Sequence, residues 1–152
     1  MRTIVSVLSI GLALASTANP DDLTAEEAAV WDLEKSYYRF AKENDREGYL
    51  SLFDEHVIGW PAFDNRPKGK SHVSQWITTV HADASQTWNY ELNRLAIKAF
   101  GDVVVVHYLL RDYFTSAESG DELSSNLYRI SHTWKRYGDE WKIVSGMGSP
   151  HD

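Results

Sequence analysis

The sequence predicts an α+β domain in which N-terminal helices pack on one face of a curved antiparallel sheet. Apolar residues recur at helical spacing between Val30 and Ala41, and this segment follows a capping box, Thr24-Ala-Glu-Glu27. From Trp88 onward, apolar and polar residues alternate instead, which is typical of strands with one buried face. A chain that places its helices before its long strands favours an α+β fold.

Three helices are expected before the long strands. The first should run from a cap at Thr24 to about Glu43, where Asn44-Asp45 ends it. Asp45 can cap a short second helix, and Ser71 can cap a third. Each of these segments carries its apolar residues on one side, so all three can cover a sheet.

Four long strands and one short strand are expected. The short strand spans 57–63, and Pro61 within it suits an edge position or a bulge. The first long strand changes parity at Asn93-Arg94, which predicts a bulge that curves the sheet. The run Val103–Leu110 is apolar on both faces, which indicates a strand covered on both sides.

The C-terminal segment 127–149 predicts a long hairpin. Gly138-Asp139 supplies its turn, because glycine adopts positive φ without steric cost. His132 is unusual in this hairpin, because it is a titratable group between an isoleucine and a tryptophan on the apolar face. The residues predicted to alternate on the two apolar faces are Tyr128, Ile130, His132 and Trp134, then Trp141, Ile143, Ser145 and Met147.

Length and composition exclude several classes of protein. A chain of 152 residues is typical of one domain with a sizeable core. The net charge of −7 argues against binding to nucleic acid, which needs clustered Lys and Arg. With no cysteine, disulfides and thiol chemistry are excluded. The six histidines lack the close spacing of metal-ligand pairs, so neither a metal nor a cofactor is expected.

The N-terminus has the pattern of a secretory signal peptide. Arg2 is followed by the apolar run Ile4–Ala15, which is too short to span a bilayer. Small residues suited to cleavage lie at Ala13-Leu-Ala15 and Ser16-Thr-Ala18. We therefore expect residues 1–18 to be removed and a single domain, 19–152, to be secreted or periplasmic without membrane contact. The alternative is a buried or disordered N-terminal segment.

Three further stretches carry a family resemblance: Asn44–Phe53, Pro67–Ser71, and Ser131–Val144 with the Ser149-Pro150 that follows. With the order of elements, they resemble the nuclear-transport-factor-2-like superfamily, in particular its SnoaL-like and ketosteroid-isomerase-like members. The resemblance implies a cone, in which the three helices pack on the concave face of the sheet and enclose an apolar pocket. Many members dimerise through the outer face of the sheet, so a homodimer is expected.

The resemblance to ketosteroid isomerase carries over only in part. Tyr37 matches the oxyanion-stabilising tyrosine of that enzyme, and His132 matches its second oxyanion donor. The position of its catalytic aspartate falls at Trp60, which cannot take a proton. Many SnoaL-like relatives also carry a histidine where this chain has Met147. Steroid isomerisation by that mechanism is therefore not expected.

The candidate catalytic residues are His132, Asp112 and Tyr37. His132 can act as a general acid or base, or it can be a core histidine bonded to a backbone carbonyl or a tyrosine. Only one of Tyr37 and Tyr38 should face the pocket, and only one of Arg111 and Asp112. An inward Asp112 near His132 would form an acid–base pair, whereas the alternative is a salt bridge at the mouth of the cone.

Aromatic residues are the candidates for ligand contact, although core packing would explain each one singly. The leading function is binding of a small, largely apolar molecule in an aromatic pocket. The first alternative is a cofactor-independent enzyme that performs proton transfer or isomerisation, hydration or cyclisation with His132. The second is a structural or accessory protein. The predicted ligand-binding residues are Trp60, Trp76, Tyr108, Tyr128, Tyr38 and Trp88.

Overall fold

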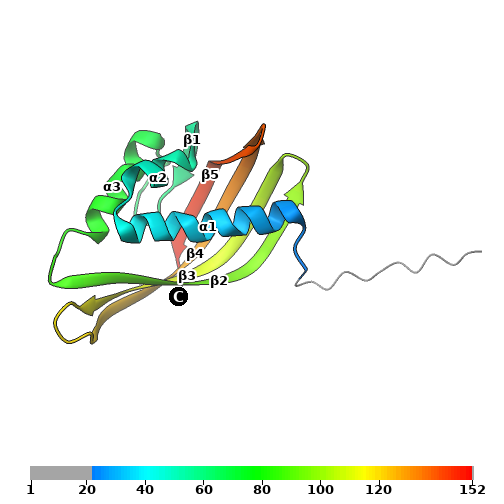
Figure 1. Cartoon of the computed structure of the whole chain (residues 1–152). Helices are drawn as coiled ribbons and strands as arrows, with labels where there is room; N and C mark the ends of the chain where they lie inside the picture. The colour runs from blue at the N-terminus through cyan, green and yellow to red at the C-terminus, as the bar shows by residue number, and fades with distance from the viewer. Residues whose placement is uncertain (1–21, 152) are drawn as a thin grey trace, which may run out of the picture.

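One curved, open sheet and three helices make up the fold, as Figure 1 shows. This computed structural model describes residues 22–151, and the predicted signal peptide at 1–18 lies outside them. The predicted α+β fold is confirmed. The elements are α1 (Ala25–Glu43), α2 (Arg46–Ser51), β1 (Phe53–Trp60), α3 (Lys70–Val80), β2 (Gln86–Phe100), β3 (Val103–Ser116), β4 (Glu122–Tyr137) and β5 (Glu140–Pro150).

The sheet is mixed, and its strand order is β1-β5-β4-β3-β2. The pairs β2–β3, β3–β4 and β4–β5 are antiparallel, whereas β1 pairs with β5 in parallel. Helix α1 contacts β2 and β3, while α2 and α3 contact β1 (Figure 1). The short strand therefore lies at an edge, as predicted, but it spans Phe53–Trp60 instead of 57–63, and Pro61 follows it directly.

Two of the three helices begin at the N-cap residue that the sequence predicts. Thr24 and Glu27 form the predicted capping box, with the Thr24 amide 3.0 Å from Oε2 of Glu27. Asp45 caps α2 by accepting a hydrogen bond from the amide of Gly48 at 2.9 Å. The predicted cap at Ser71 is wrong, because Gly69 holds the N-cap position and Ser71 lies within the first turn of α3.

Each antiparallel strand pair contains one register shift, and the shifts in β2–β3 and β4–β5 bear on the predictions. The first lies between Arg94 and Ala96 of β2, next to the predicted bulge. The second separates the pair Trp134–Ile143 from the pair Thr133–Ser145. After it, Gly146 and Gly148 stand opposite His132 and Ile130. The predicted shared face of Ile143, Ser145 and Met147 is therefore wrong beyond Ile143.

The core lies between α1 and the inner face of the sheet. Val30, Ala41 and Trp134 are completely buried there. On β3 the inner row is buried, and it consists of Val104, Val106, Tyr108 and Leu110. The outer row is half-buried apart from the exposed His107, so a single chain does not fully cover this face. Within residues 22–151, every helix is too short or too polar to cross a lipid bilayer.

Candidate functional site

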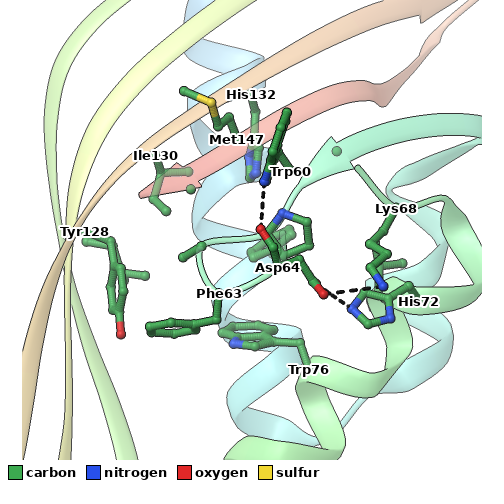
Figure 2. Close-up of a pocket in the computed structure, with 18 of the residues that line it drawn as sticks. Trp60, Phe63, Asp64, Lys68, His72, Trp76, Tyr128, Ile130, His132 and Met147 are labelled. Carbon is green, nitrogen blue, oxygen red and sulfur yellow. Dashed lines mark hydrogen bonds and ion pairs between the residues drawn. The ribbon is translucent and has the colours of Figure 1, made fainter. Parts of the chain in front are cut away.

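An open pocket of about 570 Å³ lies between the helices, the loop after β1 and the inner face of the sheet (Figure 2). The polar side chains that line it include His132, Tyr37 and Asp112. Aromatic rings dominate its lining, and they come from α1, α2, α3, β1, the 61–69 loop, β3 and β4: Tyr37, Tyr38, Tyr49, Phe53, Trp60, Phe63, Trp76, Phe114 and Tyr128.

Four of the six predicted ligand-contact residues line this pocket: Trp60, Trp76, Tyr128 and Tyr38. The other two, Tyr108 and Trp88, lie behind the lining and are almost completely buried. Their ring centroids lie 6.1 and 6.4 Å from that of Tyr38. They therefore support the wall of the pocket without forming it.

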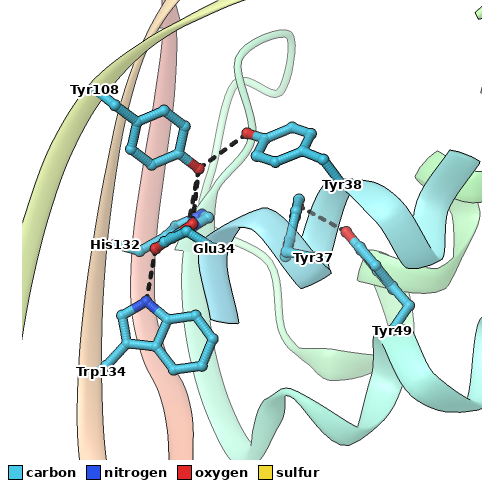
Figure 3. Close-up of polar contacts among 7 residues, drawn as sticks. All are labelled: Glu34, Tyr37, Tyr38, Tyr49, Tyr108, His132 and Trp134. Carbon is cyan, nitrogen blue, oxygen red and sulfur yellow. Dashed lines mark hydrogen bonds and ion pairs between the residues drawn. The ribbon is translucent and has the colours of Figure 1, made fainter. Parts of the chain in front are cut away.

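His132 is held at the closed end of the pocket by a buried carboxylate from α1 (Figure 3). Its Nδ1 lies 3.0 Å from both carboxylate oxygens of Glu34, whose side chain is 0% exposed. Nδ1–H therefore donates to the carboxylate, so in the neutral ring Nε2 is the proton acceptor. His132 lines the pocket, and no described residue accepts from or donates to Nε2.

Two more donors complete the surroundings of Glu34 (Figure 3). Trp134 Nε1 donates to Oε1 at 2.6 Å, and the Tyr108 hydroxyl donates to Oε2 at 2.9 Å. Since the Tyr108 proton is used in this way, the Tyr38 hydroxyl at 2.9 Å donates to Tyr108. A buried carboxylate needs such partners, because desolvation without them is strongly unfavourable.

The imidazole of His132 packs directly over Gly146 of β5. A Cβ built on Gly146 would lie 2.6 Å from Cδ2 of His132 and 3.2 Å from Nε2. No ordinary side chain can occupy that position without moving the ring. Gly146 therefore belongs to the site, although it supplies no chemistry.

Tyr37 contributes a second proton donor beside His132. Its ring centroid lies 5.3 Å from that of His132, and its hydroxyl accepts a hydrogen bond from Tyr49 at 2.7 Å. Burial raises the pKa of Tyr37 well above its ordinary value, so the phenol is neutral. The Tyr37 proton remains for an acceptor in the pocket. Both Tyr37 and Tyr38 line the pocket, so the prediction that only one of them faces it is wrong. They differ in where their hydroxyls donate.

Asp112 faces the pocket, while Arg111 points to the outer face and pairs with Glu91 and Glu122. Asp112 lies opposite Asn126 of β4, whereas His132 lies opposite Val106. Asp112 and Val106 are six residues apart on β3, so Asp112 and His132 are separated by roughly 20 Å along the strand direction. The predicted pair of Asp112 and His132 is wrong, because Glu34 is the carboxylate that holds His132.

Glu34 is a residue of the candidate site that the sequence did not predict. It lies four residues after Val30 and four before Tyr38, and both of these are buried. A charge within the buried stripe of an amphipathic helix needs a partner, so this spacing is the signal that would have found it.

A third polar group lies at the mouth of the pocket, on the loop 61–69 (Figure 2). Asp64 Oδ2 lies 3.0 Å from Nε2 of His72, and Lys68 Nζ lies 3.4 Å from Oδ1. Trp60 Nε1 donates to the backbone oxygen of Asp64 at 2.8 Å. This fastened loop places Phe63, which is 80% exposed, edge-on against Tyr128. No three His, Asp or Glu side chains of residues 22–151 gather as metal ligands.

The family model and the similar solved structures relate this chain to the same fold. A family model described as a SnoaL-like domain matches residues 30–152. A nuclear-transport-factor-2-like protein of unknown function from Pseudomonas putida is 22% identical, with a TM-score of 0.70 over 84% of this chain and 89% of that chain. No curated protein matches the sequence.

Two other solved structures share the fold. A ketosteroid isomerase-like protein from Erwinia carotovora atroseptica is 11% identical, with a TM-score of 0.67 over 86% of this chain and 99% of that chain. A nuclear-transport-factor-2-like protein from Cytophaga hutchinsonii is 16% identical, with a TM-score of 0.64 over 85% and 100%. Identities this low establish the fold, and the chemistry has to be argued from the residues of this chain.

Proposed function

The chain belongs to the SnoaL-like domain family, and from this premise we propose that it binds one small, largely apolar molecule in its aromatic pocket. The observation that carries the proposal is the open space of about 570 Å³ between Trp76, Tyr128 and His132. Side chains would fill this space in a purely structural domain. Ligand pockets typically enclose ~300–1,000 Å³ and combine apolar walls with a few polar groups.

The test is retention of a ligand by the folded protein. Native mass spectrometry of the full chain, purified without denaturants, should show an adduct of constant mass that organic solvent releases. Ile130→Trp places an indole in the pocket and should abolish the adduct. Arg129→Trp, the matched control, adds the same ring on the outer face of β4 and should retain it. Equal retention by both variants would reject the pocket as the binding site.

The second candidate function is proton transfer without a cofactor. It is favoured by the arrangement of His132, whose Nδ1 is fixed by Glu34 while Nε2 is left without a protein partner in the described chain. Nε2 would take a proton from a bound carbonyl compound, and the Tyr37 hydroxyl would donate to the developing oxyanion. The phenol of Tyr37 keeps its proton until that moment.

Deuterium incorporation into an enolisable aromatic ketone such as 2-tetralone, followed by NMR in D₂O, tests this candidate. The protein should accelerate exchange at the α-carbon, and His132→Gln and Tyr37→Phe should remove the acceleration. His107→Gln alters an exposed histidine on the outer face and is the control. Acceleration that survives His132→Gln would reject the acid–base role. A protein that neither accelerates exchange nor retains a ligand would fit the accessory role instead.

The proposal includes export and self-association. The apolar run at Ile4–Ala15 supports cleavage after residue 18, and N-terminal sequencing of protein from the periplasm or medium would reveal the cut. The half-buried outer row of β3 supports a homodimer through the outer face of the sheet; it includes Val103, Val105 and Leu109. Light scattering that gives a monomer mass at micromolar concentration would reject the dimer.

A further inference from the structure

Asp112 is a pocket carboxylate that the protein leaves without a cation. Within residues 22–151 no Lys or Arg pairs with it, and its neighbour Arg111 is engaged on the other face by Glu91 and Glu122. Its protein hydrogen bond comes from Asn126 Nδ2, at 3.2 Å from Oδ1. Asp64, the other carboxylate that lines the pocket, has both Lys68 and His72.

Aromatic residues surround Asp112 on both neighbouring strands. Tyr90 lies directly opposite it on β2, and Phe114 follows two residues later on the same face of β3. Trp88 pairs with Phe114, and Tyr128 lies two pairs beyond Asn126 on β4, on the same face. The setting is therefore one carboxylate within a group of four aromatic side chains, open to the pocket on one side.

The electrostatics of this setting favour one sign of charge. Burial raises the pKa of the Asp112 carboxyl, while the approach of Asn126 and Trp88 opposes that rise. The Trp88 indole N–H nevertheless falls short of a hydrogen bond, since Nε1 has no partner in the described chain. The faces of aromatic rings attract cations, and an ionised carboxylate attracts them more strongly. An anionic group placed here would be repelled by both.

We infer that the ligand of the pocket carries an organic ammonium group, which lies against Asp112 between Phe114 and Tyr128. The inference rests on the proposed binding function and gives the chemical class of the ligand: an amine with an apolar body. The body extends along the pocket toward Trp76 and His132. One end of the ligand is thus fixed by charge, and the rest is held by apolar contact.

Three probes of nearly equal shape test the inference: 2-phenylethylammonium, 2-phenylethanol and 3-phenylpropanoate. Binding is measured by calorimetry at pH 7 on the full chain, after any retained ligand has been removed. The ammonium probe should bind ~10- to 100-fold more tightly than the alcohol, as expected for a partly buried hydrogen bond between charges. The anion should bind more weakly than the alcohol.

Two variants test whether Asp112 causes the preference for the ammonium probe. Asp112→Asn keeps the size of the side chain and should reduce the affinity for the ammonium probe by about 10-fold, while the alcohol is unaffected. Glu91→Gln removes the same charge from the outer face of the neighbouring strand and should change neither.

Every other outcome overturns the inference. If the alcohol binds as tightly as the ammonium, or if Asp112→Asn has no effect, the cation anchor is rejected and the apolar binding function stands. If Glu91→Gln weakens the ammonium probe as much as Asp112→Asn, the general negative field of the protein is responsible. Failure of all three probes rejects the anchor, and retention of a native ligand then decides the binding function separately.

Discussion

Two carboxylates near the pocket differ in almost every physical respect. Glu34 is completely buried and has three protein donors, from His132, Trp134 and Tyr108. Asp112 is half-buried and has one, from Asn126. A carboxylate whose oxygens already accept several hydrogen bonds from the protein holds other side chains in place. A carboxylate with few protein donors can still accept hydrogen bonds from a ligand. The same side-chain chemistry therefore serves two purposes at the two ends of one cavity.

The largest expected effect is from removing the saturated carboxylate. Glu34→Ala leaves three buried donors without an acceptor and should lower the free energy of unfolding by about 3–5 kcal/mol. Denaturation in urea measures it. Asp32→Ala, on the exposed side of the same helix, should change it by less than about 0.5 kcal/mol. Comparable losses from both would mean that Glu34 is an ordinary helix residue.

A smaller effect is expected from crowding the histidine that Glu34 holds. Gly146→Ala places a Cβ 2.6 Å from Cδ2 of His132 and should cost about 1–3 kcal/mol as the ring moves. Gly148→Ala is the matched control, because its nearest contact is Cδ1 of Ile130 at 3.3 Å. The imidazole NMR resonances of His132 should shift in the first variant only. An unmoved ring in Gly146→Ala would show that the closed end is less rigid than its hydrogen bonds indicate.

The smallest effect is expected at the unsaturated carboxylate, and its sign is opposite. Burial raises the pKa of Asp112 in the folded state above the ordinary 3.8. Its contribution to stability is therefore full below pH 3.8 and is lost as the pH rises through the folded pKa. Asp112→Asn should accordingly stabilise the ligand-free protein at pH 7, by less than about 1 kcal/mol.

The pH dependence of the unfolding free energy is the control for the prediction on Asp112→Asn. The difference in unfolding free energy between Asp112→Asn and the unaltered protein should shrink as the pH falls from 7 toward 3.5. Urea denaturation at each pH measures both proteins. A variant that is less stable at pH 7 would show that Asp112 is satisfied by the protein, and the contrast with Glu34 would disappear.

The helices, strands and turns could be predicted from the sequence, but the register in which the strands pair could not. Capping at Thr24 and Asp45 and the turn at Gly138 are local, so they could be predicted from neighbouring residues. The bulge before Ser145 could not, because the apolar alternation continues through it. Parity correctly puts Asp112 on the face of Tyr108, but only the pairing of β3 with β4 fixes its distance from His132.

The sequence predicted the site residue that is unusual among its neighbours in the chain. It did not predict the residue whose role depends on contact between distant elements. His132 is conspicuous as a titratable group in an apolar row, and the structure places it in the pocket. Glu34 is inconspicuous, because a glutamate on a helix is usually solvated. Its role depends on how α1 lies over β2 and β3, because only that placement lets Glu34 reach His132 and Trp134 of β4, and this is a property of the tertiary fold.

The hydrogen bond between Glu34 and Trp134 joins residues that are 100 positions apart in the chain. The parallel pair Phe53–Ile143 spans nearly as long a segment. Contacts of such long range slow folding, because most of the chain must be ordered before they form. The closed end of the pocket therefore requires β4 and β5, the last two strands of the domain, because His132 and Trp134 of β4 are two of the three donors to Glu34.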